Sequence, residues 1–580
     1  MIKIFKTFYR YIFNYKLLFS SYLVVQIFST VIVYINPYFY KLLVNDVTGK
    51  FYSAAFQTMI ILVSFRLIAL ITSVLANYMG DHVVFPASRD IRVDVFKRIQ
   101  DLDFAFHVNK NTGALISAFK RGDGAFFNIF SEVNNELLDV LVGFITTLYF
   151  FFKVNSTLSY FLLGIFFLNI ILSWFLMKNN LNIRKKANDS EDEISGIITD
   201  NLINYETVKY FAQEKTEEKR LLDKFIPWMT NFYNYANSFR IIDIIIGLLG
   251  NAGIIIILAI VLQQSINGQI TTGDFVMVIG LVMTFFPMFL RLIYRIRNIA
   301  KSFIDMEKYF NILYEKDIVL DPINPVNIKS IKGDIEFKNV GFSYPEGKKD
   351  VVKDINLKIT QGESVAFAGK SGVGKTTLIR LLLRFYDVSQ GEVLIDGINI
   401  KEFTKAKLRS FMGLVPQEPI LFNNTIDFNI CYGKPEASED EIIKAAKLAN
   451  LHNFIESLPL KYETQVGERG IKLSGGQKQR LAIARVILAD PKIIIFDEAT
   501  SNLDSESERL IQNALWKIAK NRTLIIIAHR FSTIRKASRI VVFDKGRIMD
   551  EGIHEDLIKN DQSLYGYLWN LQAKGEINKN

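Results

Sequence analysis

Gly369-Lys-Ser-Gly-Val-Gly-Lys-Thr-Thr377 lies between an apolar run and a helix-forming run, and the architecture of the chain's second half follows from it. The stretch fits GxxxxGK[ST], in which glycines let backbone N–H groups approach a phosphate. Ser364–Ala368 predicts the preceding strand, and Thr376–Phe385 predicts a helix whose N-terminal dipole favours anions. Lys375 is predicted to reach the β- and γ-phosphates, and Thr376 to bind Mg²⁺. The predicted phosphate-binding loop comprises Gly369, Lys370, Ser371, Gly372, Val373, Gly374, Lys375, Thr376 and Thr377.

Two later apolar runs are predicted to end at the same site. Ile493–Phe496 predicts a buried strand followed by Asp497 and Glu498. An acidic pair at this distance behind a phosphate loop predicts that Asp497 holds Mg²⁺, and that Glu498 polarises the attacking water as a general base. Thr523–Ala528 predicts another strand, which delivers His529 to sense a γ-phosphate. Taken alone, such a histidine is more often structural, and the surrounding motifs reverse that weighting.

Four further motifs add to this site. Gln417 is predicted to lie between the nucleotide and the loops of the first half of the chain. Tyr344 offers an aromatic face for adenine, the alternative being a turn residue beside a proline. Asp504 follows the acidic pair closely and is a candidate for coupling two sites. Leu473-Ser-Gly-Gly-Gln477 is predicted to contact a nucleotide held by a phosphate loop, through Ser474, Gly475, Gly476 and Gln477.

The first 300 residues are predicted to span a membrane. Half of the chain's residues are hydrophobic, 47 of them Phe, and apolar runs near the length needed to cross a bilayer recur in this region. A buried soluble core rarely needs so many runs of this length. The predicted spans lie near 17–44, 54–85, 136–153, 157–177, 241–264 and 275–296.

Lys and Arg residues orient these spans. The loop 178–235 carries nine of them and the loop 86–130 carries seven, whereas the connections on the other side carry only Lys41, Lys50 and Lys153. By the positive-inside rule, both chain ends and the two long loops share the face of the phosphate-binding domain. The long loops are predicted to be helical extensions of the spans, with Asp103–Thr112 and Tyr205–Glu214 as contact segments at their tips.

Domain boundaries follow from a change in pattern. Asp321-Pro-Ile-Asn-Pro325 breaks helix, and short strand-like runs begin after it. We therefore predict a membrane domain over 1–315, a linker over 316–332 and a nucleotide-binding domain over 333–575. The formal charge of +10 accompanies no nucleic-acid motif, so no nucleic-acid partner is expected. The single cysteine, Cys431, excludes an internal disulfide framework and a cysteine metal cluster.

Together these motifs resemble the ABC transporter family over essentially the whole chain. The resemblance implies six transmembrane helices with long intracellular extensions, of the exporter type, followed by an α/β P-loop ABC ATPase domain. It implies ATP and Mg²⁺ as ligands, with Thr376, Gln417 and Asp497 near the metal, and Glu498, His529 and Gln417 in catalysis. In that family each ATP lies between the loop of one domain and the Leu473–Gln477 motif of another, which implies a homodimer; a heterodimer is the alternative.

Asp200–Glu214, with Asn204-Tyr-Glu-Thr-Val-Lys-Tyr-Phe211 inside it, resembles the Atm-type half-exporters and their heavy-metal-tolerance relatives. Phe106–Gly113 resembles their first coupling region. This resemblance implies export of a glutathione-linked sulfur or iron–sulfur compound from the matrix across the inner membrane of a mitochondrion or mitochondrion-derived organelle. The N-terminus is basic, which fits organelle targeting or a positive-inside flank equally.

An anionic cargo also fits the arginines near the ends of two spans, because charged residues within a membrane usually face a cavity. Snorkelling or anchoring is the alternative interpretation. Asn180 and the Ile244–Ile246 run depart from the subgroup's pattern, which indicates a retuned pocket. Export of lipids or hydrophobic compounds, and an ATP-gated regulator that does not transport, are the alternative functions. The predicted cargo residues are Arg184, Asn180, Asp243, Arg291, Arg295 and Arg297.

Overall fold

The computed structural model describes residues 2–109, 112–345, 350–467, 470, 472–497, 505–528, 531–560 and 562–573. The chain divides into two compact units. A helical unit comprises Met1–Asp101 and Lys110–Glu315, and an α/β unit comprises Leu102–Asn109 and Lys316–Asn580. The short segment Leu102–Asn109 therefore belongs to the α/β unit, although its neighbours in sequence belong to the helical unit.

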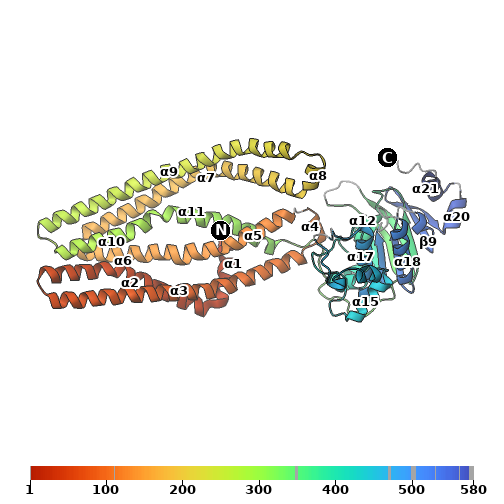
Figure 1. Cartoon of the computed structure of the whole chain (residues 1–580), viewed down its shortest axis with the longest axis horizontal. Coiled ribbons are helices and arrows are strands. Elements are labelled where there is room, and N and C mark those ends of the chain that lie inside the picture. Colours follow the sequence, from red (N-terminus) through yellow and green to blue (C-terminus); the bar gives the residue numbers. More distant parts are fainter. Residues whose placement is uncertain are drawn as a thin grey trace. The chain divides into compact units, whose positions relative to one another are not determined.

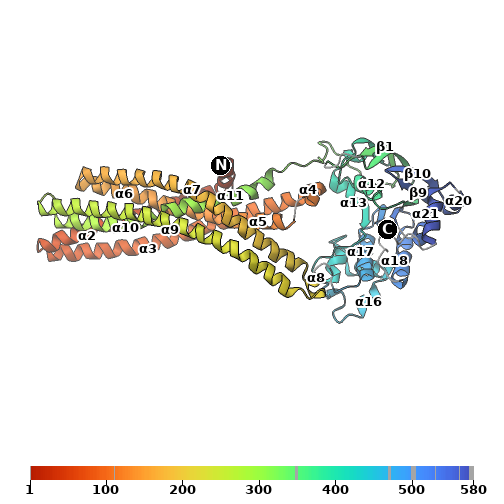
Figure 2. The same ribbon diagram turned by 90° about the horizontal axis from the view of Figure 1, so that it is seen from above.

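Long helices make up the helical unit, and Figures 1 and 2 show α7 running beside α9, and α2 beside α3. Between α5 and α6 the helix continues as one π-helical stretch, η2. These elements are α1 (Ile2–Ile12), α2 (Lys16–Thr48), α3 (Tyr52–Asp101), α5 (Thr112–Ser131), η2 (Glu132–Leu137), α6 (Leu138–Val154), α7 (Ser156–Ile203), α8 (Tyr205–Tyr210), α9 (Glu214–Ile266), α10 (Thr272–Leu290) and α11 (Leu292–Tyr314).

Five stretches in the described part of the chain are long and apolar enough to cross a membrane: Lys3–Thr48, Tyr52–Asp101, Ala118–Val154, Glu214–Ile266 and Thr272–Tyr314. A shorter apolar stretch, Ser156–Leu172, lies at the start of α7. Apolar side chains point outward along these helices. On α3, for example, Leu67, Leu70 and Ile71 are 56%, 62% and 65% exposed. Apolar side chains exposed along a helix of this length suit a hydrocarbon environment, which agrees with the membrane prediction.

Small residues and polar caps hold these helices together. A Cβ atom at Gly143 would lie 2.3 Å from the Tyr34 ring, so α2 and α6 approach as closely as a glycine permits. At the start of α10, Thr271 and Asp274 form a capping box, and Asp274 also pairs with Lys41 of α2 at 2.6 Å. The beginning of α10 is thereby fixed to the end of α2.

Two sheets form the core of the α/β unit. A six-stranded sheet has the order β10-β9-β3-β8-β7-β6, with its last five strands parallel, and an antiparallel sheet has the order β2-β1-β4-β5. The strands are β1 (Ile335–Phe342), β2 (Val352–Ile359), β3 (Ser364–Ala368), β4 (Gln390–Ile395), β5 (Ile398–Asn399), β6 (Met412–Val415), β7 (Ile493–Asp497), β8 (Thr523–Ile527), β9 (Arg539–Asp544) and β10 (Arg547–Gly552).

Continuous apolar runs explain the parallel strands. Every residue of β8 is buried, and Ile493–Phe496 of β7 are at most 2% exposed. Strands buried on both faces read as unbroken apolar sequence, unlike the alternating pattern of a half-exposed sheet. Two core clusters cover the faces of this sheet.

The remaining elements of this unit are mostly short helices. They are α4 (Phe104–Asn109), α12 (Lys375–Leu382), η3 (Ile400–Glu402), α13 (Lys405–Ser410), α14 (Ile426–Cys431), α15 (Glu439–Leu448), α16 (His452–Glu456), η4 (Lys461–Glu463), α17 (Gly475–Ala489), α18 (Ser505–Ile518), α19 (Phe531–Ile534), α20 (His554–Lys559) and α21 (Leu564–Ala573).

Candidate nucleotide-binding site

The carboxyl ends of four neighbouring parallel strands create the site. In the strand register, Phe367 of β3 lies opposite Ile527 of β8, and Ile527 lies opposite Asp497 of β7. β7 in turn pairs with β6, which ends at Val415. The loop after β3, the carboxylate ending β7 and the Gln417 segment after β6 therefore leave one edge of the sheet, where open α/β sheets bind ligands.

Backbone geometry shows that the loop after β3 has a phosphate-binding conformation. Gly369 has a φ of +134°, and a Cβ there would lie 2.3 Å from the carbonyl oxygen of Phe543. Gly374, with a φ of +108°, is the N-cap of α12. Only glycine meets both requirements, and the exposed N-terminal residue Thr376 places a hydroxyl beside the helix end. The residues present thus fit a phosphate group.

Lys375 turns back over this loop. Its Nζ donates to the carbonyl oxygens of Gly369 at 2.6 Å and Lys370 at 2.8 Å, and the residue is only 5% exposed. Burial of an ammonium group requires polar partners, which the loop carbonyls supply. The cation is consequently fixed against the same loop whose N–H groups favour an anion.

Tyr344 is joined to the helix that follows the loop. Its hydroxyl lies 3.1 Å from Thr377 Oγ1 and accepts a hydrogen bond from Arg380 Nη1 at 3.1 Å. The ring meets Phe342 and Tyr386 edge-on, at centroid distances of 5.0 and 5.2 Å. The aromatic ring is half-buried beside the loop, as a surface for stacking a base requires.

Two more of the predicted residues lie at the carboxyl ends of their strands. Asp497 is half-buried at the end of β7, and Gln417 is exposed just after β6. Thr376, Asp497 and Gln417 supply a hydroxyl, a carboxylate and an amide oxygen, the donor types that suit Mg²⁺. Glu498, Asp504 and His529 lie outside the described residues, and their roles stay predictions.

Ser474–Gln477 forms the beginning of α17. The backbone N–H of Ser474 donates to Gln477 Oε1 at 2.8 Å, and the N–H of Gln477 donates to Ser474 Oγ at 3.3 Å. This capping box satisfies two helix N–H groups while Ser474 and Gly475 stay exposed. The motif therefore presents a stable, accessible helix end.

In the helical unit, two predicted cargo residues contact neighbouring helices. Asn180 of α7 is 2% exposed and donates to Ser238 Oγ of α9 at 2.6 Å. Tyr294 of α11 donates a short hydrogen bond to Asp243 of α9. The structure thus brings α7, α9 and α11 together around Ile242 and Ile246.

The arginines in this region differ in their hydrogen-bond partners and in their exposure. Arg295 pairs with Glu132 at 3.4 Å and Glu136 at 2.5 Å, both on η2, so carboxylates of the protein already surround it. Arg291 is exposed at the junction of α10 and α11, and Arg184 is half-buried on α7. The side chain of Arg297 lies outside the described residues. Arg66, whose position within a span is unusual for a cation, donates to the Tyr40 hydroxyl at 2.6 Å.

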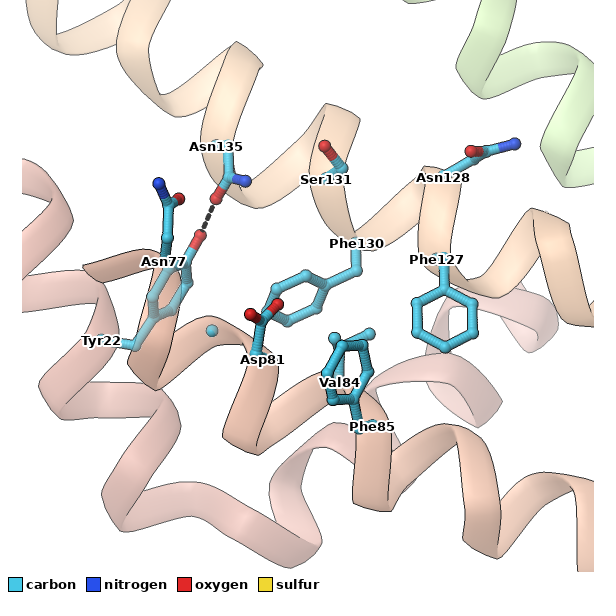
Figure 3. A pocket seen from close by; sticks show the side chains of 11 residues that line it. Tyr22, Asn77, Asp81, Val84, Phe85, Phe127, Asn128, Phe130, Ser131 and Asn135 are labelled. Atoms are coloured by element: carbon cyan, nitrogen blue, oxygen red, sulfur yellow. Dashed lines mark hydrogen bonds between the residues drawn. The ribbon is translucent and has the colours of Figure 1, made fainter. Parts of the chain in front are cut away.

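A separate cavity of about 250 Å³, lined by both polar and apolar side chains, lies where α2, α3 and the α5–η2 helix meet (Figure 3). Asp81 points into it from α3, and Asn128, Ser131 and Asn135 line it from α5 and η2. Tyr22 donates to the backbone oxygen of Asn134 at 3.0 Å and to the side chain of Asn135. None of the predicted cargo residues whose side chains the structure describes lines this cavity.

Comparison with known proteins identifies the family to which both halves of the chain belong. Residues 19–288 match the ABC transporter transmembrane region, and residues 352–501 match the ABC transporter domain. A solved structure of a bacterial Atm1-family ABC exporter with ATP bound superposes with a TM-score of 0.87 and 30% identity, covering 96% of this chain and 98% of that one. The chain is an ABC transporter of the Atm1 exporter family. The predicted family and fold class are confirmed.

Curated relatives agree with this membership. Heavy metal tolerance factor 1 of Caenorhabditis elegans, ABC transporter B family member 6 of Dictyostelium discoideum and the human protein named iron-sulfur clusters transporter ABCB7, mitochondrial, are each 36% identical to it over 84% of its length. The chain spans 60%, 74% and 65% of these relatives, respectively. This ABC transporter is thus a multi-pass membrane protein with an ATPase-type domain.

Sequence reasoning missed several polar contacts of this transporter. Glu132 and Glu136 are four residues apart, a spacing that indicates one helix face, but their partner Arg295 is some 160 positions away. Arg380 lies in the predicted helix after the phosphate loop, and only the fold shows that it reaches Tyr344.

Proposed function

We propose that this protein is an ATP-driven homodimeric exporter. The observation that carries the proposal is the phosphate loop after β3 on the same sheet edge as Asp497, in a chain that also holds an exporter-type membrane region. The proposed organisation is a membrane domain over 1–315, a linker over 316–332 and an ATPase domain over 333–575.

We assign the nucleotide-site roles as follows. Lys375 and the loop N–H groups bind the phosphates, and Tyr344 stacks on adenine. Thr376, Asp497 and Gln417 would hold Mg²⁺, which when bound neutralises phosphate charge. Glu498 accepts the proton of the attacking water, and His529 holds the γ-phosphate end of the site.

The proposed dimer follows from the exposed helix end at Ser474. A phosphate loop supplies one side of a nucleotide site, and Ser474–Gln477 of a second copy would supply the other, so that two equal sites form around a two-fold axis. Binding of two ATP molecules would then favour the closed pair, and hydrolysis would release it. Coupling to the membrane helices would switch cargo access from one face to the other.

For the cargo, we propose a glutathione-linked sulfur or iron–sulfur compound. Support comes from the names of the worm and human relatives, and from Arg184 and Arg291, which are not bound to carboxylates among the described residues. Asn180, Asp243 and Arg297 are proposed to line the same path. Arg295 would contribute less, because two glutamates already neutralise it. The proposed location is the inner membrane of a mitochondrion or mitochondrion-derived organelle, with the ATPase domain on the matrix side.

The test is ATPase activity of the purified protein in lipid vesicles, titrated with oxidised glutathione and, separately, with lipids and hydrophobic drugs. Stimulation by oxidised glutathione that Arg184→Ala removes while basal activity persists supports the proposal. Stimulation by the hydrophobic compounds alone would replace it with a lipid or drug exporter. The Glu498→Gln variant should bind ATP without turnover, which checks that the measured activity belongs to this site.

A further inference from the structure

The segment Leu102–Asn109 is anchored within the α/β unit by a buried carboxylate. Asp103 is 7% exposed and accepts hydrogen bonds from the backbone N–H groups of Ile318 and Val319, the second at 2.9 Å. Lys405 of α13 also donates to Asp103 at 3.1 Å. One side chain therefore ties this segment to both the start of the unit and its third helical element after the phosphate loop.

The next residue, Phe104, lies against the far end of the phosphate-loop helix. Its ring stacks on Phe385 at a centroid distance of 4.4 Å and an interplanar angle of 8°, and meets Tyr386 edge-on. The Arg380 guanidinium lies 5.7 Å from the centroid of the Phe104 ring. This distance is within the range at which a cation and an aromatic face attract each other.

Arg380 also contacts the residue that we assign to adenine. Its Nη1 donates to the Tyr344 hydroxyl at 3.1 Å, and the same hydroxyl lies 3.1 Å from Thr377 Oγ1. Thr377 and Arg380 are three positions apart and so lie on one face of α12. Tyr344 is thus held by two groups of one helix face, and one of these groups is itself held by Phe104.

We propose that Arg380 is a positioning residue that links the docking of Leu102–Asn109 to the orientation of Tyr344. With Phe104 seated, Arg380 is fixed and holds the Tyr344 ring where a purine stacks. With Phe104 withdrawn, Arg380 gains rotamers and the ring loses one of its two hydroxyl contacts. This inference rests on the proposed function in one respect, namely that Tyr344 stacks on the base.

Thermodynamic linkage makes the effect reciprocal. If seating of Phe104 increases affinity for the base, a bound base must increase the stability of the seated segment by the same factor. The segment follows directly on α3 in the chain, so a movement of α3 that withdraws Phe104 would also weaken base binding.

The test uses the full-length protein in lipid nanodiscs, and measures the KM and kcat of ATP hydrolysis together with equilibrium ATP binding. Arg380→Gln and Phe104→Leu are each expected to raise the KM and Kd for ATP about fivefold, as loss of one modest contact does, with kcat within about twofold of the wild type. Arg380→Lys, which keeps the charge but not the guanidinium fork, is expected to fall between. The matched controls are Arg547→Gln and Val108→Ala, since both side chains are exposed, and they should leave KM unchanged.

A double-mutant cycle separates positioning from general damage. In a Tyr344→Ala background, adding Arg380→Gln should change the Kd for ATP by less than about twofold, because the ring that Arg380 positions is gone. An undiminished fivefold effect in that background, or an unchanged Kd in Arg380→Gln alone, overturns the inference. If Arg380→Gln lowers the thermal midpoint, Phe104→Leu and Arg380→Lys carry the same test. A wild-type protein that binds ATP but does not hydrolyse it would instead count against the proposed function, and leaves the Kd comparison intact.

Discussion

In the α/β unit, the backbone conformation determines the shape of the phosphate loop. In the helical unit, contacts between side chains determine the surroundings of the polar residues. Gly369 and Gly374 fix the loop through φ values that other residues avoid, and Lys375 is held by two carbonyl oxygens. Arg295, by contrast, has its surroundings set by Glu132 and Glu136 on another helix. A backbone-built site can be recognised from a short stretch of sequence, and a site built from paired side chains cannot.

The largest expected effect comes from disabling the phosphate loop, whose shape the backbone determines. Lys375→Ala should lower ATP hydrolysis by about a hundredfold or more, because a fixed cation at the transferred phosphate is removed. Steady-state phosphate release measures this loss. Lys444→Ala removes an exposed lysine of the same unit and serves as the control. Hydrolysis within a few-fold of the wild type in Lys375→Ala would remove this loop from the mechanism.

Asp103 combines the two ways of building a site, because its side chain accepts hydrogen bonds from backbone N–H groups. Asp103→Ala should leave two backbone N–H groups without their acceptor and remove the ion pair with Lys405, at a cost of about 1–3 kcal/mol. We expect hydrogen exchange of residues 102–109 to rise by roughly tenfold or more, because local opening becomes easier. The neighbouring Asp101→Ala, at an exposed position, should change little. Equal exchange in the two variants would show that the carboxylate does not anchor this segment.

The smallest effect separates two arginines of the membrane region. Arg295→Ala leaves two glutamates facing each other, and should lower the thermal midpoint of the detergent-solubilised protein by roughly 2–4 °C per kcal/mol lost. Arg291→Ala, at an exposed position, should leave the midpoint unchanged. In Arg295→Ala, a further Glu136→Gln substitution should restore part of the loss. Equal midpoints for the two single variants would mean that the ion pairs contribute nothing measurable.

These contrasts also show which features of the protein can be predicted from its sequence. The strand Ser364–Ala368, the loop after it and the buried strand ending at Asp497 are all present where the pattern predicts them, because local rules of glycine geometry and apolar burial fix them. The predicted helix after the loop begins one residue earlier and ends at Leu382. The pairing of Arg295 with η2, the Tyr294–Asp243 contact and the Arg380–Tyr344 bond join distant segments, and no local pattern encodes them.

Mixing two inactive variants addresses the central claim that two copies form each nucleotide site together. Lys375→Ala disables the phosphate loop and keeps Ser474, whereas Ser474→Arg disables the helix end and keeps the loop. Neither variant alone can assemble a complete site, but a mixed dimer contains one intact loop opposite one intact helix end. We predict ATP hydrolysis after co-expression that neither variant shows alone. Hydrolysis that stays at the level of the separate variants, or full activity in a wild-type protein held as a monomer, would contradict the account.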